Sequence, residues 1–431
     1  MTFVSPGLIM EMSVMHKTKQ GVNRMKMLIA NIHMKTGGNR RSLLNLLSNI
    51  DMENNEVDLF LFAHNGNVRR DIDQIKGVRL LDESFLLNMF YTPLKTYCEK
   101  KEISKMVLKK AISFLTRVIG TRKMLLFMMI FQRRLGGYDV AISFAHDKWV
   151  GGFYGGCNDF VKKKVSSKRK VAWIHNDPYK LALTREICEK TYEEFDCIVN
   201  VSNACKNKFD EIIPKYKYKS VVVYNMFSTD EIREMAQKYN PYDYDGFKIV
   251  TVARMFNLQK RIDRIIECCV RLKQESIEGF RWYVVGEGPD LSWLKGKAAN
   301  EGLQDIVIFE GYKENPYPYM RYADVFVLTS VYEAHGMVVT ESLITGTPVI
   351  VTDYEEVFEF VKQNINGIIT VNSTDGVHEA VKDALLHKEK LMPLREYIAK
   401  QDFDNTLALE QFRGAVSGKT GQRGGDIYGR D

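Results

Sequence analysis

The sequence predicts an α/β protein built on two doubly wound parallel sheets, one in each of two Rossmann-like domains. Short apolar runs alternate with helix-length segments in two sets, and residues 240–247, which are rich in turn formers, separate the sets. The runs are continuously apolar, which is typical of strands buried on both faces of a parallel sheet. A length of 431 residues is enough for two domains with separate cores.

The first set predicts an N-terminal domain at residues 25–239, and the second predicts a C-terminal domain at residues 248–400. Strands of the first domain are expected at residues 27–32, 57–62, 140–144, 171–174, 198–201 and 221–223. Strands of the second are expected at residues 249–252, 282–285, 306–309, 325–328 and 349–351. Residues 1–24 lack clear periodicity and the tail 418–431 is rich in glycine and charge, so both ends are expected to be disordered.

The composition indicates a globular protein of the cytoplasm. Apolar residues make up 45% and charged residues 27% of the chain. The longest apolar run, residues 124–131, is too short to span a bilayer, and no signal-peptide pattern opens the chain. The seven cysteines are scattered without metal-binding spacing, so reduced thiols are expected.

The positive charge is concentrated in one region. Residues 91–170 carry 18 Lys and Arg against 5 Asp and Glu, although the net charge of the whole chain is only +7. Within the basic region 100–134, Ile103, Val107, Ala111, Phe114 and Val118 recur at helical spacing. A basic amphipathic helix of this kind is expected to rest on an anionic membrane surface, and the alternative is a helix packed on its own domain. Nucleic-acid binding is not expected, because no recognised motif and no interleaved aromatic residues accompany the charge.

Two carboxylates eight residues apart carry the main functional signal. Glu333 follows the predicted strand 325–328, so it lies at the carboxyl edge of the sheet, where open α/β sheets bind ligands. Gly336 permits a tight turn, and Met337 and Val338 open a helix whose free N–H groups favour an anion. Glu341 follows about one turn into that helix. Carboxylates that can accept hydrogen bonds from sugar hydroxyls, next to a helix start that can bind a phosphate, predict a nucleotide-sugar site.

Two cations are predicted to face the same ligand. Arg254 follows the strand 249–252, and Lys260 precedes the next helix, so the two can hold a diphosphate from two sides. Arg261 and Arg264 come next, and their periodicity predicts that they are solvated.

Several glycine-containing turns also follow strands. Gly286 and Gly288 come after the strand 282–285 and are expected to let the backbone approach a nucleotide, with a simple tight turn as the alternative. Tyr312, after the strand 306–309, is expected to contact the edge of the nucleotide base through its backbone. In the first domain, Gly37 and Gly38 precede a helix and are expected to cradle a phosphate.

Two histidines follow strands of the first domain. His175 comes after the strand 171–174 in Trp173-Ile174-His175-Asn176-Asp177, and it is expected to face the cleft side of the sheet. His146, in Phe144-Ala145-His146, is a weaker candidate of the same kind.

Together these motifs resemble the retaining GT-B-fold glycosyltransferases of family 4, over about residues 25–412. The resemblance is carried in order by Gly37-Gly38, Arg254…Lys260, Gly286-Glu287-Gly288-Pro289, Glu333…Glu341 and Asn366-Gly367. It implies two domains facing across a cleft, with a helix in residues 401–417 crossing back to the first domain. It also implies a nucleoside-diphosphate sugar in the C-terminal domain and the acceptor in the N-terminal domain.

The resemblance assigns roles to the same residues. Arg254 and Lys260 would hold the diphosphate, Glu333 the sugar hydroxyls and Glu341 the ribose. His175 would line the donor sugar. Such enzymes retain the anomeric configuration without a protein nucleophile, so none is nominated.

Two positions depart from the usual pattern of the family. Asn39-Arg40 follow Gly38 where the family usually reads Ala-Glu, and Ala334-His335 follow Glu333. His335 is open to three interpretations: tuning the accepted sugar, facing the diphosphate, or filling the loop. Members with similar variants build capsular or exopolysaccharide repeat units. A UDP-sugar donor and a polyprenyl-diphosphate-linked acceptor, used at the inner face of the cell membrane, are therefore expected.

Other classes of protein fit less well. The Asp-x-Asp triplets at Asp71 and Asp243 do not follow strand ends of a nucleotide-binding unit, so no essential metal and no other cofactor is expected. No G-x-G-x-x-G opens either half, which disfavours a dehydrogenase. An epimerase would not need both the cation pair and the carboxylate pair, and no motif supports a pyridoxal phosphorylase. An inactive subunit that activates a partner transferase stays open as the alternative.

Overall fold

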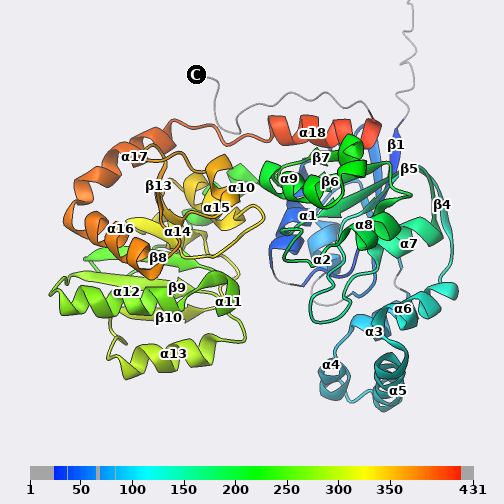
Figure 1. Cartoon of the computed structure of the whole chain (residues 1–431), viewed down its shortest axis with the longest axis horizontal. Coiled ribbons are helices and arrows are strands. Elements are labelled where there is room, and N and C mark those ends of the chain that lie inside the picture. Colours follow the sequence, from blue (N-terminus) through cyan, green and yellow to red (C-terminus); the bar gives the residue numbers. More distant parts are fainter. Residues whose placement is uncertain (1–23, 36, 65–67, 83, 419–431) are drawn as a thin grey trace, which may run out of the picture.

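The computed structural model describes residues 24–35, 37–64, 68–82 and 84–418 (Figure 1). It has two lobes side by side, each built around one parallel sheet. The ends predicted to be disordered lie almost entirely outside the described residues.

In the described part of the first lobe, the sheet has the strand order β3-β2-β1-β4-β5-β6-β7, and all pairings are parallel. The six predicted strands are confirmed, and β3 at the edge was missed. The strands are β1 Met25–Asn31, β2 Asn55–Leu61, β3 Val78–Leu80, β4 Leu135–Ser143, β5 Val165–Ile174, β6 Cys197–Asn200 and β7 Ser220–Val222.

The second lobe, as far as it is described, has a parallel sheet in the order β10-β9-β8-β11-β12-β13. The five predicted strands are confirmed, and the edge strand β13 was missed. The strands are β8 Phe247–Val252, β9 Phe280–Val285, β10 Val307–Gly311, β11 Val325–Leu328, β12 Val349–Thr352 and β13 Gly367–Thr370.

Helices lie around both sheets (Figure 1). Those of the first lobe are α1 Gly38–Asn49, α2 Val68–Asp73, α3 Phe85–Tyr91, α4 Leu94–Glu99, α5 Ile103–Ile119, α6 Thr121–Ile130, α7 Cys157–Lys164, α8 Arg185–Tyr192 and α9 Asn203–Ile212. The later ones are α10 Thr229–Ala236, α11 Asn257–Lys260, α12 Asp263–Gln274, α13 Leu291–Asn300, α14 Tyr317–Arg321, α15 Met337–Ile344, α16 Thr374–Leu386, α17 Leu391–Ala399 and α18 Thr406–Ser417. No helix in the described ranges is long and apolar enough to cross a membrane.

The chain crosses between the lobes twice. The first crossing leads to α10, which packs on α14 and α15, and residues 240–246 then run without helix or strand to β8. The second crossing leads from α17 to α18, which lies on β5 and β6 of the first lobe. Thr229 Oγ1 donates to the Phe403 carbonyl at 2.6 Å, and the Phe227 N–H donates to Asn405 Oδ1 at 2.9 Å. The two crossings are therefore bonded to each other.

One apolar cluster continues from the first lobe into the second. Val223 and Phe227 belong to it on one side, and Val339 and Phe360 on the other. The lobes thus share a buried apolar junction, which holds them against each other.

Candidate functional site

The carboxyl edge of the second sheet brings together two predicted site residues that are 73 positions apart. Strands β8 and β11 are parallel neighbours, so the segments that follow them are adjacent. Lys260, at the end of α11, forms an ion pair with Glu333 Oε1. Ser330 Oγ donates to the same oxygen at 2.7 Å, and only 7% of Glu333 is exposed. Gln259 Nε2 donates to the other oxygen, Oε2, at 3.4 Å, so three donors hold the carboxylate in place.

A break between α11 and α12 positions Lys260. Arg261 has a φ of 47°, a left-handed conformation that few side chains adopt, and its guanidinium bonds Asp263 Oδ1 at 2.9 Å. The helix expected after Lys260 is α12, and the short helix α11, which ends at Lys260, was not predicted. Gln259 Nε2, on α11, donates to the Tyr332 carbonyl at 3.2 Å and joins the segment that carries Glu333.

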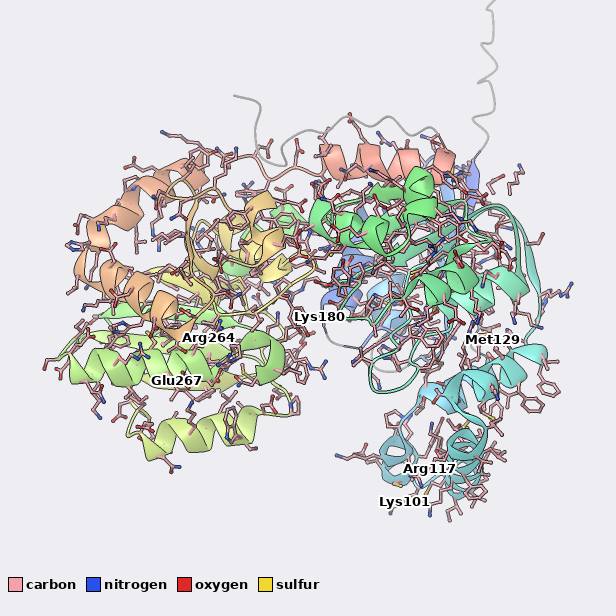
Figure 2. All side chains as sticks on the ribbon, in the orientation of Figure 1. Lys101, Arg117, Met129, Lys180, Arg264 and Glu267 are labelled. Carbon is pink, nitrogen blue, oxygen red and sulfur yellow. The ribbon has the colours of Figure 1, made fainter. Side chains whose placement is uncertain are left out.

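Arg264 is buried, so the prediction that it is solvated is wrong. Only 5% of it is exposed, and it donates to the Thr329 carbonyl at 3.2 Å and to Asn372 Oδ1 at 2.6 Å (Figure 2). Burial lowers the pKa of its guanidinium. Because Thr329 precedes Ser330, Arg264 braces the loop that leads to Glu333. Helical periodicity failed here because this face of α12 packs against polar loop backbone.

The Arg254 side chain is exposed and has no hydrogen bond or ion pair with the described residues. Its backbone is shaped by the two glycines after β9. A Cβ at Gly286 would lie 1.9 Å from the Ala253 carbonyl oxygen, and one at Gly288 would lie 2.3 Å from the Met255 carbonyl oxygen. The glycines therefore allow two protein loops to touch, and their predicted approach to a nucleotide stays a prediction.

Gly336 begins α15 in a left-handed conformation, with φ of 72°. A Cβ there would lie 2.7 Å from Tyr354 Oη, so a side chain would not fit. Met337 and Val338 follow in the first helical turn, where backbone N–H groups have no carbonyl partner within the helix. The predicted anion-favouring helix start is therefore present directly after Glu333.

Glu341 is fully buried, and both of its oxygens lie 2.7 Å from Arg41 Nη1. Arg41 comes from α1 of the other lobe, and its guanidinium lies 5.4 Å from the centre of the Tyr317 ring. Burial raises the pKa of the Glu341 carboxyl, and the ion pair opposes that rise. In this arrangement of the lobes, a ribose would have to displace Arg41 to bind Glu341.

His175 is packed among aromatic rings at the end of β5. Its ring stacks on Trp173 at 5.8 Å between centroids and lies 4.3 Å from the Phe144 ring. Its buried Nε2 has no hydrogen-bond partner among the described residues. Burial, together with nearby His146, holds its pKa well below the ordinary value, so the imidazole is neutral at pH 7. His146 Nδ1 accepts from the His175 backbone N–H at 3.2 Å, so His146 helps to position the backbone of His175.

The loop that carries His175 reaches the segment that carries Glu333. Lys180 Nζ lies 4.9 Å from the centre of the Tyr332 ring, and Figure 2 shows Lys180 between the two lobes. Asp177 bonds Lys208 at 2.9 Å, and Lys208 also bonds Glu356 of the second lobe at 2.8 Å. The two predicted halves of the site therefore face each other across the junction.

The two glycines at the start of α1 border open space. Gly37 has a φ of 132°, and a Cβ added at Gly37 or at Gly38 would meet no atom within 4 Å. Tyr312 is about half exposed beside the end of β10. Both positions leave room for a ligand.

His335 lies in the junction itself. Its Nδ1 is 3.3 Å from the Val201 carbonyl oxygen of the first lobe, and its ring centroid is 4.0 Å from that of Phe360. Burial lowers its pKa to about 4. Among the three interpretations of His335, the geometry is nearest to a loop residue that packs between the lobes.

Sequence reasoning missed Arg41, Ser330 and Gln259. The departure from the family pattern after Gly38 marked the start of α1, but it did not indicate a contact with Glu341 about 300 residues away. Within the described ranges, no three His, Cys, Asp or Glu side chains are grouped so that they could hold a metal ion.

Comparison with known proteins agrees with this geometry. Residues 232–401 match the family described as "Glycosyl transferases group 1". The chain is 25% identical over 218 residues to the N-acetyl-alpha-D-glucosaminyl L-malate synthase of Bacillus anthracis, which covers 48% of this chain and 56% of that protein. It is 24% identical over 192 residues to the lipopolysaccharide core biosynthesis glycosyltransferase LpsE of Rhizobium meliloti, covering 44% and 54%. The chain spans about half the length of the curated relatives it matches.

Solved structures extend the likeness to both lobes. The structure of HepE from Anabaena in complex with UDP-glucose superposes with a TM-score of 0.64 at 16% identity, covering 92% of this chain and all of that one. At this identity the likeness shows the fold, and the predicted class of two facing Rossmann-like domains is confirmed. The chain therefore has the GT-B fold, and its residues 232–401 resemble the group 1 glycosyltransferases.

Proposed function

We propose that this chain transfers a sugar from a nucleoside-diphosphate sugar to a saccharide linked to polyprenyl diphosphate. The observation that carries the proposal is the charge arrangement after β8 and β11: a free Arg254, and Lys260 bonded to Glu333, beside the first turn of α15. A UDP-sugar is the first donor to test, because HepE, which has the same fold, was crystallised with UDP-glucose.

In this proposal the protein stabilises the departing nucleotide. Breaking the bond between the anomeric carbon and the phosphate oxygen leaves negative charge on the diphosphate, and Arg254 and Lys260 offset that charge. The N–H groups of Met337 and Val338 add donors at the helix start. We expect no essential metal, because the protein itself supplies these two cations.

The same proposal places the sugar between the lobes. Glu333, once Lys260 turns to the diphosphate, accepts hydrogen bonds from sugar hydroxyls. The unpartnered Nε2 of His175 bonds the sugar from the other side. The acceptor oxygen bonds the anomeric carbon on the face that the phosphate leaves, its proton passes to the leaving phosphate oxygen, and the configuration is retained without a protein nucleophile.

Gly37, Gly38, Gly286, Gly288, Tyr312 and Glu341 complete the proposed donor site. For Glu341 the proposal requires a change, since the ribose takes the place of Arg41. The alternative of an inactive subunit is not favoured, because both cations and both carboxylates are present.

Two observations support the proposed acceptor and pathway: the exposed surface of the first lobe and the name of one relative. Exposed apolar residues on α5 suit a protein that works at a membrane, on the cytoplasmic face where we place it. LpsE is named for lipopolysaccharide core biosynthesis, which suits a role in making a capsule or another surface polysaccharide.

A thermal-shift series tests the donor proposal. Purified protein is heated with UDP, GDP, ADP and UDP-sugars, with and without Mg²⁺. A nucleotide at a hundred times its Kd adds about 2.7 kcal/mol to the free energy of unfolding. We expect a metal-independent shift with the UDP series that is lost in Arg254→Ala and kept in Arg321→Ala, an exposed arginine outside the site. No shift with any nucleotide would remove the transferase proposal and leave the inactive subunit.

A further inference from the structure

We propose that a polar cavity between α2 and the α4–α5 corner binds the phosphorylated head of a lipid-linked acceptor, while the apolar face of α5 carries its hydrocarbon chain. This inference rests on the proposed function, and it joins the basic region 100–134 to Arg69 and Asp82, which no sequence motif includes.

The cavity has a volume of about 470 Å³. It opens at the carboxyl ends of two neighbouring strands, because Asp82 follows β3 and Arg69 lies on the helix that follows β2. In parallel sheets this edge is the one that binds ligands, and it is the edge that faces the donor lobe. The cavity therefore lies on the correct side of the first lobe for an acceptor.

The lining offers two kinds of recognition. Arg69 and Lys100 are exposed cations with no ion pair among the described residues, so they are available to a phosphate. Asp82, Asn88 and Thr96 supply carboxylate, amide and hydroxyl groups of the kind that bind sugar hydroxyls. A phosphate joined to a saccharide satisfies both sets, whereas a bare hydrocarbon satisfies neither.

The same corner is contiguous with the loop that leads to Gly37. Lys109 of α5 donates to the Phe90 carbonyl, and its pKa is lowered by burial and by the charge of Lys35, which lies in that loop. From the other side, Tyr154 Oη lies 2.9 Å from His33 Nε2, and its ring contacts Tyr91 at the end of α3. Lys109 is one helical turn from Lys105, which lines the cavity, so the α4–α5 corner lies beside the loop that leads to Gly37.

The apolar face of α5 begins where the cavity ends. Lys105 lines the cavity, whereas Ile103 and Val107 on the same turns are 73% and 64% exposed. Phe114 and Val118 continue the exposed face along the helix. A polar cavity joined to an exposed apolar face fits an amphipathic ligand of negative charge, and the surrounding excess of Lys and Arg favours that charge. The occupant that combines these features is a prenyl diphosphate carrying sugar.

Farnesyl diphosphate is a suitable probe, because it has the diphosphate and a short prenyl chain. Its binding to the full chain is measured by calorimetry for the wild type, Arg69→Glu and Lys100→Glu. Lys95→Glu, on α4 but outside the cavity, is the matched control. Each cavity variant is expected to weaken binding roughly tenfold or more, and the control by less than about twofold. UDP affinity, measured on the same samples, is expected to stay unchanged in all four proteins.

Three results would overturn the inference: equal affinity of the cavity variants for farnesyl diphosphate, binding of inorganic diphosphate as tight as that of farnesyl diphosphate, or binding of farnesol as tight. The second would indicate a free anion site and the third a purely apolar one. Failure of UDP to bind the wild type counts against the donor proposal alone, so the two failures can be told apart.

Discussion

Glu333 combines burial, a cationic partner and a place at the carboxyl edge of the second sheet, so its charge is expected to matter more to turnover than to folding. Glu333→Gln keeps the size of the side chain and a hydrogen bond with Ser330, but it removes the charge that we propose receives sugar hydroxyls. Turnover of the donor is expected to fall roughly a hundredfold or more, with a melting temperature within a few degrees of the wild type. Glu301→Gln, at an exposed position, is the control. Turnover like that of the wild type would remove Glu333 from the site.

The burial of His335 predicts a pH-dependent stability. Its folded pKa of about 4 lies below the unfolded value of 6.5, so the neutral imidazole stabilises the fold above pH 6.5 and that contribution is lost as the pH falls toward 4. At pH 5 the loss is about 2 kcal/mol. Urea unfolding at pH 7.5 and pH 5 measures it: His335→Phe is expected to lose about 2 kcal/mol less than the wild type. His387→Gln, at a half-exposed position, is expected to lose as much as the wild type.

At this scale the sequence predicted that Lys260 and Glu333 lie at one site, but it predicted neither their ion pair nor the residues that surround it. Lys260 and Glu333 each follow a buried strand, and β8 and β11 are neighbours, so local pattern and topology together bring them close. Arg41 and Arg264 carry no such pattern. Their contacts depend on how a helix packs on another lobe or on a distant loop, which helical periodicity does not record.

The glycine turn after β9 is expected to be a stability element. A methyl group at Gly286 would overlap the Ala253 carbonyl, and its φ of 141° disfavours a side chain, so Gly286→Ala is expected to cost about 3 kcal/mol. Gly296, in the middle of α13 with no atom near its Cβ position, is the control. Gly296→Ala is expected to stabilise by about 0.5 to 1 kcal/mol. Chemical unfolding measures both, and a neutral Gly286→Ala would show that the loops can separate freely.

Helix α5 is expected to dock on anionic bilayers through its exposed apolar face. Phe114 and Val118 are 66% and 67% exposed, so their transfer into lipid is favourable. Phe114→Glu with Val118→Glu is expected to weaken co-sedimentation with phosphatidylglycerol vesicles roughly tenfold or more. Leu386→Glu changes another exposed apolar residue, on α16, and is expected to leave binding unchanged. If the double variant binds like the wild type, α5 is an ordinary surface helix.

Among the elements, the sequence predicted central strands and missed edges. The strands β3 and β13 are short and partly exposed, and β3 contains Arg79, so neither shows the continuous apolar run of a strand buried on both faces. The amphipathic pattern of α5 was recognised, but its orientation was left open, because spacing alone does not say whether the apolar face packs or is exposed.

At the scale of the whole molecule, the ion pair of Arg41 and Glu341 joins the two lobes. Removing Arg41 leaves a buried carboxylate without a partner, so Arg41→Ala is expected to cost about 3 kcal/mol, at the low end for a buried pair because the guanidinium is about a third exposed. With Glu341→Gln and the double variant, chemical unfolding gives a double-mutant cycle whose coupling is expected to exceed about 1 kcal/mol. Arg40→Ala is the control, because Arg40 pairs with Asp71 inside the first lobe. It is expected to lower the free energy of unfolding by less than about 1 kcal/mol. Additive single effects would show that the pair does not hold the lobes together.

The overall architecture followed from sequence because strand periodicity and the order of motifs are local, whereas the contacts across the junction are not. Val201, Glu356 and Phe360 belong to segments with no functional pattern, yet they decide how the lobes meet.

The bonded crossings at Asn405 have a mechanical consequence. Asn405 accepts from the Phe227 N–H, and its amide donates to the Phe227 carbonyl at 2.7 Å. The two chain segments that connect the lobes are therefore bonded side by side and form one hinge. If the lobes rotate about this hinge, each atom moves in proportion to its distance from the hinge line. Residues beside the hinge would barely shift during such a rotation, whereas the residues of each lobe that lie farthest from the hinge would move the most.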